Sequence, residues 1–181
     1  MTDHDAHEHE HTHEGHHHGH EPPQLDPAQH RAEAVALFNM VWEMLDAPER
    51  TPELDDRMVH ASHASAWHWS QAGELGGSQE RAIGEWQCSR VYSVLGRGEP
   101  ALHHARACLA ICEETGLGDW VLAAAYEALT RAWTVAGDAA EGQAWLARAR
   151  TATAAIADPE DREVIDSDLA ALAALPVLAG D

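Results

Sequence analysis

Apolar residues recur at intervals of three and four from about position 28 to about position 174, which is the spacing of one face of an α-helix. Short stretches rich in glycine, proline and aspartate interrupt this pattern. The pattern predicts an all-α fold with seven helices and almost no strand. The helices are expected at 28–46, 52–72, 79–95, 99–115, 119–136, 139–156 and 159–174. Because the connectors are short, neighbouring helices should form antiparallel hairpins.

Several residues mark where helices should begin. Asp26 and Asp158 each precede a proline, which is the pattern of an N-cap followed by a first-turn proline. Asp138 and Glu141 have the spacing of a capping box. The chain is therefore expected to consist of a tail over 1–27, one helical domain over 28–175 and a C-terminal tail over 176–181.

Two segments of the predicted domain, 88–111 and 129–151, share a pattern of small residue, aromatic residue, glycine and small residue. The matching residues are Ser89, Tyr92, Gly96 and Ala101 in the first and Thr130, Trp133, Gly137 and Gly142 in the second. The pattern resembles the tetratricopeptide repeat, although its glycines lie 41 positions apart, against a usual repeat of about 34. The resemblance implies a superhelix or bundle of α-hairpins with a binding or scaffold role. The alternative is another antiparallel bundle with alanine-rich contacts.

The net charge of the chain limits the classes of partner that it can bind. Its 181 residues include 31 acidic and 11 basic residues, giving a net charge of −20. This charge repels phosphate backbones and anionic membranes, so we expect neither nucleic acid nor a membrane as a partner. A negatively charged chain is more compatible with cations, or with a protein or peptide that has basic segments. No membrane span or secretory signal is recognisable and the number of cysteines is odd, so we expect a cytoplasmic protein with reduced thiols.

Nine of the 15 histidines lie between positions 4 and 20, where acidic residues are interleaved and no basic residue occurs. Side chains of alternate residues in an extended chain point the same way, so these imidazoles can converge on one ion. Imidazole suits Zn, Ni and Cu. The candidate ligands are His7, His9, His11, His13, His16, His17 and His18. We expect this tail to be disordered without metal; the alternative is an inert, solvated arm.

His60 and His63 lie three positions apart on the predicted second helix, so they share one side of it. Such a pair can hold a metal ion when another element supplies a further ligand. Glu85, on the same helix stripe as Cys88, stands where an apolar residue is usual, and a buried carboxylate needs a partner. We expect Glu85 to meet His63 or His68 of the second helix, as a salt link or as two ligands of one ion. The alternatives are that the histidine pair is exposed and that His68 is a hydrogen-bonded core residue.

A second candidate metal site follows one face of the predicted fourth helix, where His104, Cys108 and Cys112 are spaced by four. An imidazole and two thiolates would suit Zn or Cu(I). The alternative is that both cysteines pack in the core as small apolar residues. Cys88 shares its stripe with Tyr92, so all three cysteines are expected to be shielded.

Aromatic residues of the helices could line a ligand groove; the candidates are Trp67, Trp86, Tyr92 and Tyr126. No phosphate loop, Cys-x-x-Cys pair, nucleophile elbow or His-Glu-x-x-His motif is present. The favoured hypothesis is a tetratricopeptide-like binding protein with a metal-binding tail, in metal handling or sensing. One alternative is a small helical metalloenzyme that uses His60, His63 and Glu85. The other is an interaction scaffold with an inert tail.

Overall fold

The computed structural model describes residues 24–179, so the histidines expected to bind metal in the tail lie outside the described residues. The described part is helical and has no strand, which confirms the predicted all-α class and its seven long helices. The helices are α1 (Pro27–Leu45), α2 (Pro52–Gln71), α3 (Ser78–Val94), α4 (Gly98–Thr115), α5 (Asp119–Ala136), α6 (Ala139–Ala154) and α7 (Pro159–Ala173), with a 3₁₀ turn η1 (Gly73–Leu75) and a short α8 (Pro176–Ala179).

The three predicted N-cap aspartates all cap their helices, but the reciprocal capping box forms at Asp26 and not at Asp138, where it is expected. The Asp26 side chain accepts a hydrogen bond from the Gln29 amide at 2.8 Å, and the Gln29 side chain accepts one from the Asp26 amide at 2.8 Å. This reciprocal pair satisfies donors that the first turn of α1 leaves without an intrahelical partner. Asp158 accepts from the Glu160 amide at 2.8 Å. Asp138 accepts from the Glu141 amide at 3.1 Å, but its own amide donates to the Trp133 carbonyl at 3.1 Å, so only half of the expected capping box forms.

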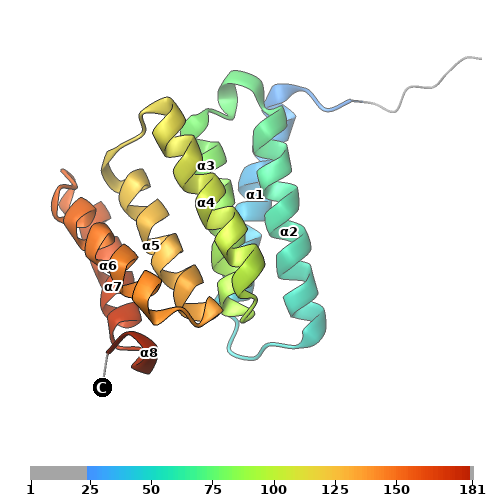
Figure 1. Ribbon diagram of the computed structural model, residues 1–181. Helices are drawn as coiled ribbons and strands as arrows, with labels where there is room; N and C mark the ends of the chain where they lie inside the picture. Colours follow the sequence, from blue (N-terminus) through green and yellow to red (C-terminus); the bar gives the residue numbers. More distant parts are fainter. Residues whose placement is uncertain (1–23, 180–181) are drawn as a thin grey trace, which may run out of the picture.

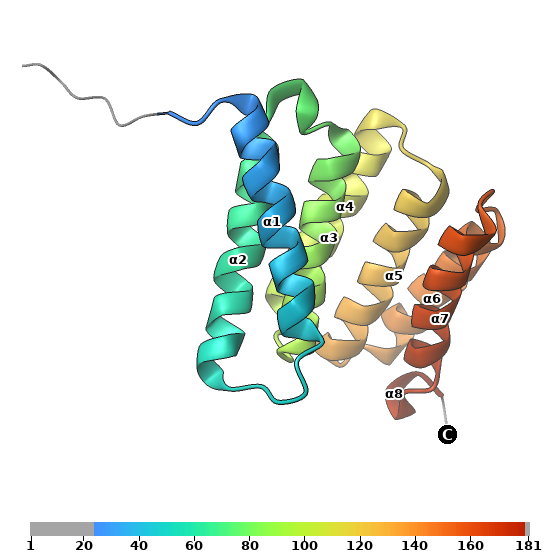
Figure 2. The same ribbon diagram turned by 180° about the vertical axis from the view of Figure 1, so that it is seen from behind.

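The helices pack as antiparallel hairpins in two layers. Helices α1, α3, α5 and α7 form one layer, which faces the viewer in Figure 2, while α2, α4 and α6 lie behind them. In Figure 1 the second layer is in front, with α1 partly visible behind α2 and α3 partly visible behind α4. Helix α3 contacts both α2 and α4. Side chains from α2, α3 and α4 can therefore meet on one face of the molecule.

Small residues allow these three helices to approach closely. A Cβ atom on Gly84 of α3 would lie 3.3 Å from the Ala66 Cα atom of α2, so glycine permits this contact. On the other side of α3, the Ser89 hydroxyl donates to the Ala101 carbonyl of α4 at 3.0 Å. Gly96 has a φ of 71° just after α3, a backbone conformation that favours glycine, and the chain can turn there into α4.

The C-terminal residues differ from the expected tail. Residues 176–179 form α8, and Leu178 is buried in a core cluster with Leu146, Leu169 and Leu172. The Gln143 side-chain amide donates to the Leu178 carbonyl at 3.2 Å. Burial of Leu178 accounts for the difference, because a short apolar segment can dock against α6 and α7 without a long periodic pattern. None of the helices in the described part is long and apolar enough to cross a bilayer.

Candidate metal centre

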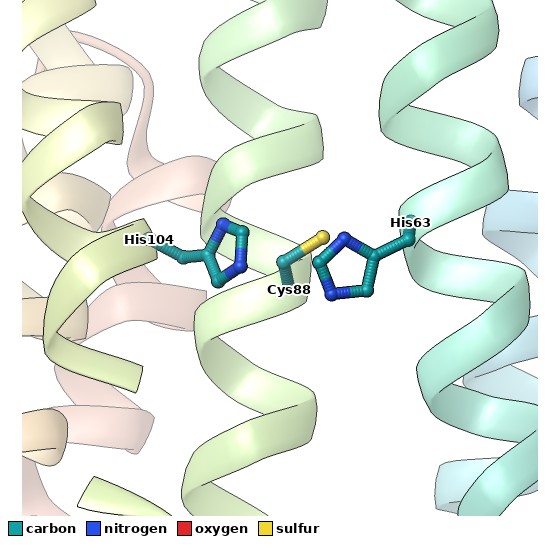
Figure 3. Close-up of side chains that lie close together, drawn as sticks. All are labelled: His63, Cys88 and His104. Atoms are coloured by element: carbon teal, nitrogen blue, oxygen red, sulfur yellow. The ribbon is translucent and has the colours of Figure 1, made fainter. Parts of the chain in front are cut away.

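Three side chains with metal-binding atoms converge on the face formed by α2, α3 and α4. His63 of α2, Cys88 of α3 and His104 of α4 each offer one ligand atom, and these atoms lie within 4.8 Å of one another. Figure 3 shows the Cys88 side chain on the middle helix, with the two imidazole rings approaching from opposite sides. Among the residues from 24 to 179, this is the group of three His, Cys, Asp or Glu side chains close enough to hold one ion.

The His104 ring is oriented by Glu85. A Glu85 carboxylate oxygen lies 2.7 Å from the Nδ1 atom of His104, which leaves Nε2 free to bind an ion. Metal-binding histidines commonly bond a carboxylate through the other ring nitrogen, which fixes the tautomer and strengthens the free nitrogen as a ligand. Both side chains are partly buried. Glu85 therefore supports a ligand in this arrangement and need not bind the metal itself.

Tyr92 orients the other imidazole. The Nε2 atom of His63 lies 2.9 Å from the Tyr92 hydroxyl, so Nδ1 is the nitrogen left free. The Tyr92 ring also lies parallel to the His104 ring, with centroids 5.6 Å apart. Partial burial, followed by repulsion from a protonated His104, lowers the pKa of His63. The lowered pKa favours the neutral imidazole, which is the form that binds a metal.

Cys88 forms the buried base of the site, with no exposed surface. Burial and the nearby Glu85 carboxylate raise the pKa of its thiol to about 12, while a hydrogen bond with Ser62 opposes the shift. At neutral pH the thiol therefore keeps its proton in the absence of metal. A metal ion must displace this proton, because the thiolate is the form that acts as a ligand.

The three ligands fit an ion of the zinc or copper type. Zinc binds thiolate sulfur at about 2.3 Å and imidazole nitrogen at about 2.0 Å, so ligand atoms in a tetrahedral site lie roughly 3.3–3.6 Å apart. The observed spacing of up to 4.8 Å requires the side chains to move inward by about 1 Å. His63 is on the exposed side of the site and has room for such a movement. Three protein ligands leave one position of a four-coordinate ion for water or another molecule.

This arrangement corrects two expectations for the second helix. Glu85 contacts His104 of α4 and not a histidine of α2, since the Glu85 side of α3 faces α4 at this level. His60 is exposed and is not part of the converging group, although it lies three positions before His63. The trio of His60, His63 and Glu85 is therefore replaced by His63, Cys88 and His104.

The expected site of His104, Cys108 and Cys112 also does not form. Cys108 and Cys112 are 1% exposed and pack in an apolar cluster with Val121 and Ala125 of α5, as the alternative interpretation held. Each step of four along a helix turns the side chain by about 40°, which carries the cysteines from the His104 side into the core. All three cysteines are free and buried, which confirms that they are shielded.

The remaining candidates are spread over the molecule. His68 faces His30 of α1, with their Nδ1 atoms 2.9 Å apart. The four aromatic residues do not share one groove. Trp67 of α2 is 55% exposed and lies beside His30, and Tyr92 of α3 contacts His63. Trp86 of α3 is half-buried and packs against the core, and Tyr126 of α5 packs against Trp145.

An apolar cavity of about 300 Å³ lies between helices of both layers. Its walls come from α1, α3, α4, α5 and α7, and Asp161 is its acidic residue. The lining residues include Phe38, Ile83, Trp86, Trp120, Val164 and Ile165. Of the four aromatic residues expected to line a groove, Trp86 is the one that lines this cavity.

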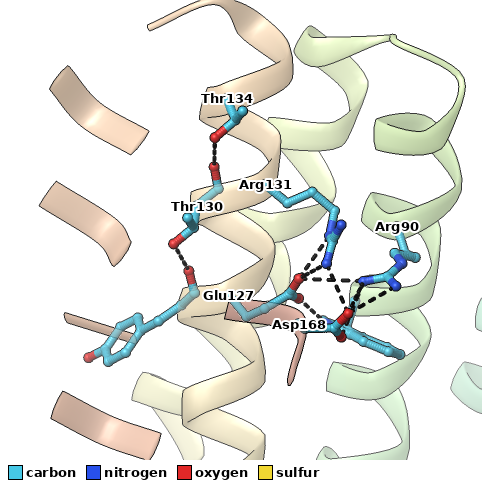
Figure 4. A network of polar contacts seen from close by, with 8 residues as sticks. Arg90, Glu127, Thr130, Arg131, Thr134 and Asp168 are labelled. Carbon is cyan, nitrogen blue, oxygen red and sulfur yellow. Dashed lines mark hydrogen bonds and ion pairs between the residues drawn. The ribbon is translucent and has the colours of Figure 1, made fainter. Parts of the chain in front are cut away.

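A paired charge network, whose charged residues are shown in Figure 4, adjoins this cavity at Trp86. Glu127 of α5 is 1% exposed, and it accepts hydrogen bonds from the Trp86 indole at 3.1 Å and from the Arg131 Nε atom at 2.8 Å. Arg90 of α3 donates to Asp168 of α7 at 3.2 Å and to Glu127 at 3.5 Å. The network joins α3, α5 and α7. Sequence reasoning missed it, because these residues are far apart in the chain and have ordinary surface types.

Comparisons of the chain with protein-family models, with curated proteins and with solved structures found no match.

Proposed function

We propose that the helical body binds a transition-metal ion, Zn²⁺ or Cu⁺, through His63, Cys88 and His104. The observation that supports this proposal is the convergence of three ligand atoms from three helices within 4.8 Å. Thiolate and imidazole together suit borderline and soft metals rather than Mg²⁺ or Ca²⁺, which prefer oxygen. The histidines between positions 4 and 20 act as accessory ligands that raise the local concentration of the ion.

The arrangement of the site supports a role in metal handling or sensing. Cys88 is buried while His63 is exposed, so ions have access from the solvent side of the face. The hydrogen bonds of Glu85 and Tyr92 hold each imidazole with one nitrogen free. The three unpaired cysteines support a reducing compartment such as the cytoplasm. The tetratricopeptide-like pattern adds an expected binding role for the body.

Co²⁺ provides a direct test in the full-length chain, because a thiolate bound to Co²⁺ gives a sulfur-to-metal charge-transfer band in the near ultraviolet. The segment 4–20 has no cysteine and cannot produce this band. We expect the band in the parent protein and its loss in Cys88→Ser. The matched control is Cys112→Ser, which changes a buried cysteine outside the site and should retain the band. Absence of the band in the parent, or its persistence in Cys88→Ser, would overturn the proposal.

The apolar cavity favours a second candidate function, the binding of a small apolar ligand. Its volume of about 300 Å³ is at the lower end of ligand pockets, and its lining is almost entirely apolar. Titration with the neutral dye Nile red should increase dye emission in the parent. The variant Ala124→Phe, which places a ring in the cavity, should reduce the increase. An equal increase in both proteins would exclude the cavity as the binding site.

A further inference from the structure

The apolar cavity between the helices has a buried floor and an exposed mouth. Ala82 of α3, Cys108 of α4 and Ala124 of α5 belong to the floor, and each is at most 5% exposed. The exposed lining residues, Asp161 and Val164, both lie on α7. A molecule that fills the cavity therefore has its outer end beside α7, next to a carboxylate.

The walls between floor and mouth suit a hydrocarbon body. Phe38, Trp86 and Trp120 contribute aromatic rings, and Ile83 and Ile165 contribute aliphatic side chains. The Trp86 indole N–H donates to a buried carboxylate at 3.1 Å, so the polar atom of this ring is already satisfied. The contact of a ligand with these walls is therefore apolar, and a polar group of the ligand is favourable only at the mouth.

The charge at the mouth is negative. Asp161 is the charged side chain among the described residues that line the cavity, and its carboxylate forms no ion pair with another described residue. The arginines of the adjoining network, Arg90 and Arg131, are paired with Glu127 and Asp168. The cavity therefore presents an unpaired negative charge and no free positive charge.

The beginning of α7 does not offer an alternative site for an anion. The first amides of a helix can bind an anionic group when they have no other acceptor. In α7 the Asp158 side chain already accepts hydrogen bonds from the Glu160 amide at 2.8 Å and the Asp161 amide at 3.3 Å. The mouth therefore disfavours a carboxylate or phosphate group and favours a cation.

We propose that the cavity binds an apolar molecule that carries a protonated amine at one end. The hydrocarbon part fills the cavity, and the ammonium group lies at the mouth, where it donates a charge-assisted hydrogen bond to the Asp161 carboxylate. The inference rests on the second candidate function, the binding of a small apolar ligand, and adds its chemical class. A neutral ligand of the same shape lacks the contact with Asp161, and a carboxylate is repelled by it.

Isothermal titration calorimetry of the full-length chain with octylamine, octanol and octanoate tests the proposal, because these probes share one hydrocarbon chain and differ in the charge of the head group. We expect octylamine to bind most tightly and octanoate most weakly. Asp161→Asn should weaken octylamine binding by about twofold to fivefold, which is the range for an ion pair at the surface. The same variant should leave octanol unchanged and strengthen octanoate binding. The control Asp166→Asn makes the same change at an exposed position of α7 outside the cavity and should retain the parent affinities.

Two further variants locate the probe. Val164→Lys places an ammonium group three positions from Asp161 on the same helix, where it can pair with the carboxylate, so it should also weaken octylamine binding. Ala124→Phe, at the buried floor, should weaken the binding of octylamine and octanol alike. Val164→Lys leaves the floor intact, and it gives its result even where Ala124→Phe lacks the parent's circular dichroism.

The outcomes separate the amine from the cavity. Equal affinities for octylamine and octanol in the parent, or equal octylamine affinities in Asp161→Asn and Asp166→Asn, would overturn the assignment of an amine and leave the cavity as a site for apolar ligands. If none of the three probes binds, or if octanol binds equally well to folded Ala124→Phe, both the amine assignment and the second candidate function fail.

Discussion

Two regions of the molecule use their polar side chains in opposite ways. Between α3, α5 and α7, Glu127 and Asp168 are paired with Arg90 and Arg131, so the charged groups satisfy one another. On the face of α2, α3 and α4, the imidazoles of His63 and His104 each retain a free ring nitrogen next to the Cys88 thiol. Charges that are fully paired fix the positions of helices, whereas converging groups with unused ligand atoms can bind an ion.

The largest effect should come from breaking the paired network. Glu127→Ala leaves the two arginines without their buried carboxylate, and loss of one partner from a buried ion network costs about 3–5 kcal/mol. The free energy of unfolding, measured with urea, should fall by this order in the variant. The control Glu163→Ala, at an exposed position of α7, should change it by less than about 0.5 kcal/mol. A similar small change for Glu127→Ala would show that the network does not hold the helices together.

A metal ion should stabilise the other face by a smaller amount. An ion that binds only the folded site adds about 2.7 kcal/mol to the free energy of unfolding when its free concentration is 100 times Kd. Urea unfolding with and without Zn²⁺ should therefore show a gain in the parent that shrinks in His104→Ala. Both proteins contain the same histidines at positions 4–20, so any contribution from that segment is common to them. Equal gains would contradict metal binding at His104.

The fold was predictable because its signals are local. Each helix start depends on residues within one turn, as the hydrogen bonds of Asp26 with Gln29 show. Glycines with positive φ, such as Gly96 and Gly137, end helices by a property of the single residue. The exception is α8, where burial of Leu178 depends on contacts with distant helices.

The site was predictable only in its parts. The sequence indicates His63, Glu85 and His104 as candidates, but it groups His63 with Glu85 and places His104 with Cys108 and Cys112. Spacing along one helix cannot reveal which neighbouring helix a side chain faces. The helical spacing puts Cys88 on the same stripe as Glu85 and predicts a shielded thiol. The combination depends on the close packing of α3 with both α2 and α4. A polar stripe on a central helix, with histidines on both neighbouring helices, is the pattern that could have indicated it.

A substitution of Glu85 tests whether its contact with His104 supports metal binding or only holds the helices in place. Glu85→Gln keeps the shape of the side chain and removes the charge that orients and polarises His104. Loss of such a supporting carboxylate weakens metal affinity by roughly 10-fold to 100-fold. Chelator competition, followed through the Co²⁺–thiolate band, should measure this loss. The control Glu80→Gln, in the first turn of α3, should leave the affinity unchanged. Equal affinity in both variants would make the Glu85–His104 contact purely structural.

The smallest expected effect is the dependence of the stability of the metal-free protein on pH. The α2–α3–α4 face contains histidines, whereas the network of Arg90, Glu127, Arg131 and Asp168 contains none. The pKa of His63 is lowered in the folded protein, so below about pH 6.5 the unfolded chain takes up a proton before the native site does. Stability should consequently fall as the pH decreases from 6.5 through the lowered pKa of His63. Solvent at the exposed side of the ring keeps the change small.

Urea unfolding at pH 7.5 and 5.5 should show a smaller loss of stability on acidification in His63→Gln than in the parent. The contribution of His68, whose pKa is also lowered, remains in both proteins. The control His103→Gln, an exposed histidine adjacent to the site, should behave like the parent. The same loss in His63→Gln as in the parent would mean that the acid sensitivity arises from groups other than His63. Among the described residues His68 also has a lowered pKa, so His68→Gln would then be the variant to compare with the parent.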